Sequence, residues 1–422
     1  MVFEEEQQQT CERVPRLSLT VRDQARHCSK NSQEYATDDS FMIIDKLIAT
    51  FQAGNYQQCI DHIAMYEGAD FEDALLNLKA SCLAKLGDLE TATALFEAAI
   101  QKYPENEKLK RNFANSLIEH RKFYQAIPIL SELNARYPSQ IDHSSNLVSC
   151  LLKTGQYQKA LKVIEKLENR LVNSDVAVNY AIALEKNGQY ARAIALTNQA
   201  VTLFPSDRAL PALLTKLKKN ACDWSPTSEH SFSAHAVTPW FGLMLEDHPE
   251  TQLRRANHYV DQLPNPVRSD AVKQVPQIRR QKLAIGYITS DLYEHATYYL
   301  MIHLWHHHNQ TEFVVHLIDI TPHHIRRTQP VPSLPPNIQY LDISNLSDSA
   351  SITAIQKLKL DIALDLKGFT KDARPELFKA RLAVVHINFL GYPGTCGSSL
   401  HDYIIADSVL IPTSSEAWYG EQ

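Results

Sequence analysis

The stretch LDIALDLKGFTKDARPELFKARLAVVHINFLGYPGTCGSSLHDYIIAD, residues 360–407, carries the clearest signal for the fold. Apolar runs rich in β-branched residues at 360–366, 383–390 and 402–407 are separated by a helical stretch at about 373–381 and by loops that contain glycine. Continuous apolar strands that alternate with helices are typical of a parallel sheet covered on both faces. The stretch therefore predicts a Rossmann-like layer.

The same alternation extends upstream to Lys282. Further strands are expected at 282–289, 312–320 and 338–343, and further helices at about 297–308 and 348–358. We therefore assign 282–422 to one Rossmann-like lobe with a parallel sheet, and 210–281 to a helical and irregular bridge.

Upstream of the bridge the sequence repeats with a period of 33 or 34 residues. The turn position of each unit is occupied by Gly54, Gly87, Arg121, Gly155 and Gly188, and small residues follow in register at Cys59, Ala92, Ala126, Ala160 and Ala193. This period, with prolines that close several units, is typical of tetratricopeptide repeats, which stack into a solenoid with a concave face. We predict about five units over 41–209, a kink at Pro128, and a disordered tail over 1–40.

Composition restricts the class of protein. The 422 residues include 42 Lys and Arg against 48 Asp and Glu, a formal net charge of −6, so nucleic acid is not expected as a partner. Three glutamates replace the positive charge of a signal peptide in MVFEEEQQQT, and no run of about 18 apolar residues is present, so we expect a cytoplasmic protein without a membrane partner. Seven scattered cysteines without C-x-x-C argue against a disulfide framework and a zinc knuckle.

Three loops of the lobe follow predicted strands, at 290–297, 367–374 and 391–399. Ligands of open parallel sheets bind at the carboxyl ends of the strands, so we expect these loops to converge on one site. His295 is suited to proton transfer or to a hydrogen bond with substrate, although a histidine without a role at a helix start is the alternative. Thr370 and Thr395 are candidates for sugar or phosphate binding, or for helix caps.

Charged and histidine-rich segments give weaker signals. Lys367, Lys371 and Arg374 fit either a diphosphate site or a solvated basic face. His303 and His307 lie four apart on one predicted helix, but Leu304 stands where a zinc protease has glutamate and no carboxylate completes a site, so we expect no metal.

At these residues the chain resembles glycosyltransferase family 41, the protein O-linked N-acetylglucosamine transferases with their SPINDLY-type and bacterial relatives. The resemblance rests on LAIGYITSDLYEHATYYLM, on the quoted stretch 360–407, on CDW and QLRRA in the bridge, and on the preceding repeats. It implies the first half of a GT-B enzyme, which transfers a sugar, typically from UDP-N-acetylglucosamine, to serine or threonine of proteins with inversion and without metal or other cofactor. The repeats would recruit acceptor proteins through their concave face.

The resemblance also implies site residues. His295 matches the family's active-site histidine, and the candidate substrate-binding residues in the three loops are Thr297, Gly368, Thr370, Gly391, Pro393, Gly394 and Thr395. Phe369 and Leu292 depart from the family pattern, which has His in many bacterial relatives and Phe, respectively, at these positions.

Length separates two interpretations of function. About 140 residues follow Lys282, enough for one Rossmann-like lobe but not for the second, where the nucleotide would bind. We expect the 422-residue chain alone to be an inactive fragment of a glycosyltransferase. The alternative is a repeat scaffold for protein–protein interaction with a vestigial glycosyltransferase lobe.

Overall fold

The computed structural model describes residues 38–422 except 67, 69–70, 168–170, 172, 208, 226–236, 246 and 265–280. They form two compact units, one ending at Lys166 and the other running from Leu167 to Gln422, and each is described by itself. Of the expected tail, positions 1–37 lie outside the described residues, and the first described helix begins at Asp38.

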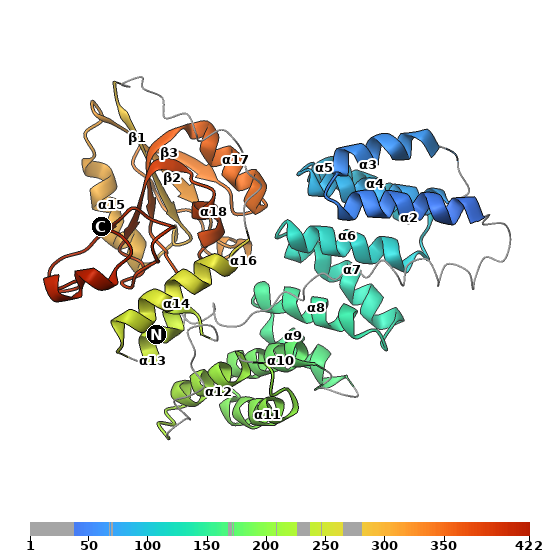
Figure 1. The fold of residues 1–422 in the computed structure, drawn as a ribbon, viewed down its shortest axis with the longest axis horizontal. Coiled ribbons are helices and arrows are strands. Elements are labelled where there is room, and N and C mark those ends of the chain that lie inside the picture. Colours follow the sequence, from blue (N-terminus) through green and yellow to red (C-terminus); the bar gives the residue numbers. More distant parts are fainter. Residues whose placement is uncertain are drawn as a thin grey trace. The chain divides into compact units, whose positions relative to one another are not determined.

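The first unit consists of short helices in which each contacts the next along the chain (Figure 1). Its helices are α2 (Asp38–Gln52), α3 (Tyr56–Ile63), η2 (Ala64–Tyr66), α4 (Glu72–Lys85), α5 (Leu89–Lys102), α6 (Glu107–Glu119), α7 (Phe123–Arg136), α8 (Ile141–Lys153) and α9 (Tyr157–Glu165).

The backbone conformation at the turn of each repeat explains why glycine occurs there. Gly54, Gly87 and Gly155 have φ between +71° and +91°, a conformation that glycine adopts without steric cost, and Arg121 adopts it at φ +59° in the remaining unit. The small residues that follow each turn in register are completely buried, as close helix packing requires: Cys59, Ala92, Ala126, Ala160 and Ala193. The repeat interpretation is confirmed, and α7 continues through Pro128 as one helix.

The second unit begins with helices of the same kind. These are α10 (Ser174–Lys186), α11 (Tyr190–Leu203) and α12 (Ala209–Asn220), and the bridge adds α13 (Pro239–Leu245) and α14 (Pro249–Gln262). A buried ion pair joins α10 to α12, since Glu185 Oε2 lies 3.1 Å from Lys216 Nζ. The part of the expected bridge at 226–236 and 265–280 lies outside the described residues.

The rest of this unit is a six-stranded parallel sheet in the order β3-β2-β1-β4-β5-β6, which confirms the Rossmann-like prediction. The strands are β1 (Leu283–Thr289), β2 (Phe313–Asp319), β3 (Gln339–Asp342), β4 (Leu360–Asp365), β5 (Ala383–Phe389) and β6 (Tyr403–Ile405). The helices that follow them are α15 (Ala296–His307), α16 (His323–Arg326), α17 (Asp348–Leu358), α18 (Pro375–Lys379) and the 3₁₀ helix η5 (Thr413–Trp418).

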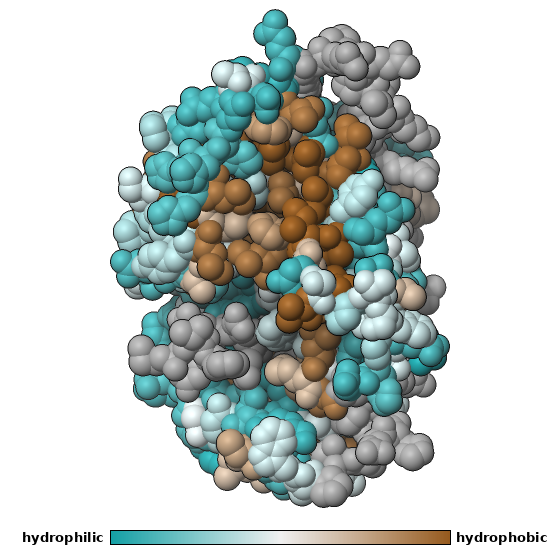
Figure 2. Space-filling model, turned by 90° about the vertical axis from the view of Figure 1, so that its left-hand side faces the viewer, coloured by the Kyte–Doolittle hydropathy of each residue, from teal (hydrophilic) through white to brown (hydrophobic). Residues whose placement is uncertain are grey.

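The two faces of the sheet are covered unequally. One face packs against α14, α17 and α18, and the other packs against Met301 and Trp305 of α15. On the α15 side, Ile387 and Phe389 of β5 are only partly buried, and their register partners on β6, Tyr403 and Ile405, are exposed. A hydrophobic area is visible on the side of the molecule where α15 and the C-terminal segment lie (Figure 2).

Candidate functional site

The loops that follow β1 and β4 are joined by a buried ion pair. Lys367 Nζ donates to both carboxylate oxygens of Asp291, at 2.9 and 2.8 Å. Both side chains are almost fully buried, so the pair fixes the two loops against each other. The expected meeting of 290–297 with 367–374 is therefore confirmed.

The loop after β5 packs directly on the loop after β4. A Cβ at Gly391 would lie 2.0 Å from the carbonyl oxygen of Leu366, so only glycine fits there. Gly368 has φ +53°, and a Cβ at this position would lie 2.5 Å from the Cβ of Tyr392. The Tyr392 ring is buried and lies 5.3 Å from the ring of Phe369, and burial holds its pKa well above the usual range. All three predicted loops thus converge at the carboxyl edge of the sheet.

His295 is the N-cap residue of α15. Its Nδ1 accepts a hydrogen bond from the backbone N–H of Thr297 at 3.2 Å, and Asp291 Oδ2 lies 3.7 Å from the same nitrogen. Because Nδ1 is an acceptor, the proton of the neutral ring lies on Nε2. The side chain is 19% exposed. A histidine without a catalytic role was also expected at a helix start. The position of His295 is therefore compatible both with an active-site role and with a role only in capping the helix.

The two candidate threonines use their hydroxyl groups inside the loops. Thr370 Oγ1 donates to the carbonyl of Lys367 at 2.8 Å, and Thr395 Oγ1 donates to Glu421 Oε2 at 2.6 Å. Thr395 Oγ1 also accepts from the backbone N–H groups of Gly397 and Gly420, each at 3.1 Å, which uses its full capacity. Neither threonine is the N-cap of a helix; Arg374 has that position before α18.

The remaining predicted site residues lie in the same loops. Thr297 is buried in the first turn of α15, Gly394 is buried, and Pro393 is half-buried, with its carbonyl accepting from the hydroxyl of Tyr419 at 2.9 Å. Leu292 and Phe369, the two departures from the family pattern, are both core residues, at 0% and 2% exposure.

Arg374 fits neither the diphosphate nor the solvated-face interpretation. Its guanidinium is buried and donates to Asp348, to the carbonyls of Ile343 and Leu346, and to Ser351. Because these partners occupy the guanidinium, Arg374 holds α17 and the loop after β3 in place.

Two residues that support the site were missed by sequence reasoning. Asn257 on α14 accepts from the backbone N–H and the hydroxyl of Ser398, both at 2.9 Å. Glu421 accepts from Thr395 and from the backbone N–H of Cys396, both at 2.6 Å. The QLRRANH and WYGEQ segments gave no signal of these contacts, because the partners are far away in sequence.

His303 and His307 lie on α15 as predicted and are exposed. In the part of the chain that the structure describes, no third His, Cys, Asp or Glu completes a site with them. No described helix has both the length and the apolar character needed to cross a bilayer.

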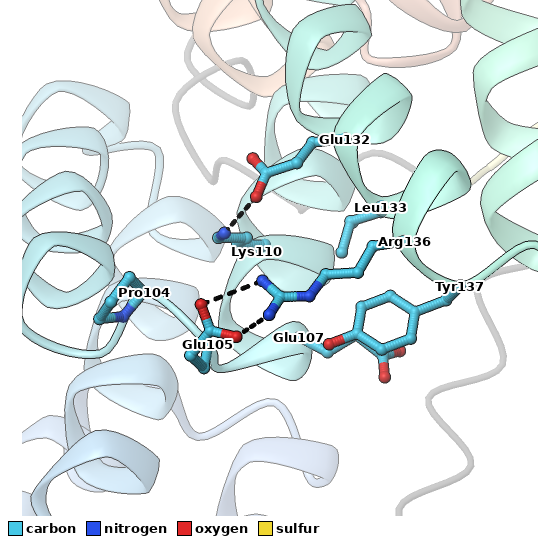
Figure 3. Close-up of a pocket in the computed structure, with 8 residues that line it drawn as sticks. All are labelled: Pro104, Glu105, Glu107, Lys110, Glu132, Leu133, Arg136 and Tyr137. Atoms are coloured by element: carbon cyan, nitrogen blue, oxygen red, sulfur yellow. Dashed lines mark hydrogen bonds and ion pairs between the residues drawn. The ribbon is translucent and has the colours of Figure 1, made fainter.

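A depression in the repeat unit lies between α6 and α7 (Figure 3). Lys110 Nζ contacts Glu132 Oε1 at 2.5 Å, and Arg136 pairs with Glu105. These ion pairs span the depression, so it is a connection between neighbouring repeats and not a ligand pocket.

Comparisons with known proteins agree with this division of the chain. Residues 258–422 match the model of glycosyl transferase family 41, and residues 38–206 match a tetratricopeptide repeat model. The probable UDP-N-acetylglucosamine–peptide N-acetylglucosaminyltransferase SEC of Arabidopsis thaliana is 29% identical over 143 residues, which are 34% of this chain and 14% of that protein. The UDP-N-acetylglucosamine–peptide N-acetylglucosaminyltransferase of Caenorhabditis elegans is 31% identical over 137 residues, 31% of this chain and 12% of that protein.

Among solved structures, a mutant of the Thermobaculum terrenum O-GlcNAc transferase aligns with 83% of this chain and 57% of its own, at 19% identity and a TM-score of 0.36. The chain therefore spans only 14% of the length of the Arabidopsis thaliana relative and 12% of the length of the Caenorhabditis elegans relative.

Proposed function

We propose that this chain belongs to glycosyltransferase family 41, because residues 258–422 match the model of that family and residues 38–206 match a tetratricopeptide repeat model. We propose further that the protein transfers N-acetylglucosamine from UDP-N-acetylglucosamine to serine or threonine hydroxyls of proteins. Transfer proceeds with inversion and without a metal at the reacting centre. The observation that carries the proposal is the convergence of three loops at the carboxyl edge of the parallel sheet. The Lys367–Asp291 pair joins two of them, and the third packs through Gly391 on Leu366.

The position of His295 defines its part in this reaction. The acceptor hydroxyl attacks the anomeric carbon while the bond to the diphosphate breaks. With Nδ1 engaged by Thr297, His295 presents Nε2–H and donates a hydrogen bond to a substrate oxygen. To accept a proton at Nε2 it would have to carry its own proton on Nδ1, which would break the helix cap. We therefore assign His295 the role of hydrogen-bond donor and leave the role of base to another group.

The donor diphosphate needs partners beyond this lobe. Two of the three basic side chains in the loop at 367–374 are already held by carboxylates, Lys367 by Asp291 and Arg374 by Asp348. We propose that a second lobe supplies the nucleotide and most diphosphate contacts, and that the 422-residue chain alone has no turnover. In this proposal Gly391, Pro393 and Gly394 line the sugar and acceptor side through their backbone.

We propose that the repeats recruit acceptor proteins. Tetratricopeptide repeats bind partner segments on their concave face. The match of residues 38–206 to the repeat model also supports the second candidate function, an interaction scaffold in which the lobe is vestigial.

The test is transfer of radiolabelled N-acetylglucosamine by the complete natural protein to proteins of a cell extract. We expect label on serine and threonine that is released by alkaline elimination. Absence of label, with repeat-dependent binding of extract proteins retained, would favour the scaffold function. The isolated 422-residue chain serves as a second sample, and label transferred by it would contradict the assignment of the donor to another lobe.

A further inference from the structure

A buried group of metal-binding side chains comes from the loop at 391–399 and from the segments that follow it. The ligand atoms of Cys396, His401 and Glu421 all lie within 4.8 Å of one another. Each of the three residues is at most 6% exposed. A fourth candidate, Asp365 at the end of β4, places its Oδ2 3.2 Å from Nε2 of His401.

The hydrogen bonding of this group is incomplete. Within the described part of the chain, neither ring nitrogen of His401 makes a hydrogen bond of acceptable geometry, although the side chain is 1% exposed. A buried imidazole whose nitrogens make no hydrogen bond is costly, and metal coordination is one way to satisfy one of these nitrogens. The position of Asp365 Oδ2 beside this ring adds a carboxylate oxygen to the same space.

The charges of the group also call for a cation. The Cys396 thiol is fully buried and shares this space with the carboxylate of Glu421. Glu421 forms no ion pair with a basic residue among the residues described. A divalent cation would stabilise the thiolate and both carboxylates together.

We propose that Cys396, His401, Glu421 and Asp365 form a structural zinc site. One sulfur, one imidazole nitrogen and two carboxylate oxygens are a donor set that Zn²⁺ accepts in tetrahedral geometry. Ligand atoms around tetrahedral zinc are about 3.5 Å apart at normal bond lengths, so the separations among Cys396, His401 and Glu421, all within 4.8 Å, would close by about 1 Å at most on binding. The thiol proton leaves to solvent as the sulfur–zinc bond forms.

The surrounding bonds orient the ligands as an outer shell does in metal sites. Thr395 and the N–H of Cys396 hold the two oxygens of Glu421, each of which keeps a further lone pair. The backbone N–H groups of Lys367 and Gly368 bind Asp365 Oδ1 at 2.8 and 3.0 Å, which leaves Oδ2 for the metal. The ion would therefore join the end of β4, the loop after β5 and the segment after η5.

The test uses the purified 422-residue chain, stripped with a chelator, reloaded with zinc chloride and passed through a desalting column. Elemental analysis is expected to find one zinc per chain, and zinc-edge X-ray absorption is expected to show one sulfur with nitrogen and oxygen ligands. Cys396→Ser and His401→Asn should each weaken zinc binding at least about tenfold. The matched controls Cys222→Ser and His303→Asn, at exposed positions, should keep it.

Several results would overturn the site. A desalted chain without zinc would do so, as would zinc retained equally by the two site variants and the controls, which would place the ion elsewhere. A first shell without sulfur in the X-ray absorption spectrum would exclude Cys396 as a ligand even if the Cys396→Ser variant did not fold. None of these readouts depends on transferase activity, so the outcome is separate from that of the proposed function.

Discussion

At the scale of single residues, the ion pair between Lys367 and Asp291 is expected to stabilise the two loops of the site. Replacing Lys367 by methionine keeps the length of the side chain but leaves the buried Asp291 carboxylate without its cation. We expect Lys367→Met to lower the free energy of unfolding by about 3–5 kcal/mol, as for other broken buried pairs. Urea denaturation followed by tryptophan fluorescence, to which Trp305 in the adjacent core contributes, measures this change.

The control for this pair is Lys371→Met in the same loop. Lys371 is more exposed and lies 4.0 Å from Asp372, so its loss should cost less than about 0.5 kcal/mol. Equal destabilisation by the two variants would show that the ion pair does not hold the loops.

His143 on α8 provides a pH test. Its side chain is fully buried, and desolvation lowers its pKa below the usual value of 6.5, although Glu107 Oε1 lies 3.1 Å from Nε2. The unfolded chain therefore takes up the proton first as the pH falls. The stability contributed by the neutral ring is complete above about pH 6.5 and declines below it.

Hydrogen exchange of peptides from α6 and α8 measures this effect. Between about pH 7.5 and 5.5, corrected protection should fall in the wild type and fall less in His143→Gln, which cannot titrate. The same loss of protection in both proteins would assign the effect to other groups.

The candidate site was only partly predictable at this scale. His295 and the three loops were found because they follow apolar strands, and strand ends position ligands in parallel sheets. Asn257 and Glu421 were missed because their roles depend on contacts with Ser398 and Thr395, which only the folded chain brings close. The internal hydrogen bonds of Thr395 likewise depend on folding.

At the scale of elements, Pro128 lies inside α7, where the sequence placed it within a helix. Proline removes a backbone hydrogen bond inside a helix and costs about 3 kcal/mol relative to alanine, of which about 1 kcal/mol is offset by a less flexible unfolded chain. We expect Pro128→Ala to stabilise the repeats by about 2 kcal/mol in denaturation followed by circular dichroism. Pro138, in the turn after α7, is the control, and Pro138→Ala should give no gain.

Most elements were predictable because their hydrophobic patterns are continuous. The six strands lie within two residues of the expected limits, since each is an apolar run between polar loops. The four-residue α16 and the helices of the bridge were not individually expected. Such short helices are stabilised by packing and carry too few residues to show a period.

For the whole molecule, the incompletely covered sheet face has a measurable consequence. Tyr403 and Ile405 on β6 are 44% and 47% exposed, beside the partly buried Ile387 and Phe389. Contiguous apolar surface of this kind promotes association. We expect the 422-residue chain to self-associate with increasing concentration in analytical ultracentrifugation, and the double variant Tyr403→Lys, Ile405→Lys to do so less.

The control for this effect is a pair of exposed apolar residues in the repeats. Met65 on η2 and Leu86 in the turn after α4 are 76% and 49% exposed, and their replacement by lysine should not change association. Unaltered association of the β6 double variant would place the contact on another surface.

The measurement that tests the account most directly is the turnover of the complete protein with His295→Asn. Asparagine can still cap α15 through its side-chain oxygen but lacks the Nε2–H that is assigned to the substrate. We expect kcat for sugar transfer to fall at least about 100-fold while thermal stability and the activity of a His303→Asn control stay unchanged. Wild-type turnover in His295→Asn would show that His295 only caps the helix, and the proposed active site would be wrong.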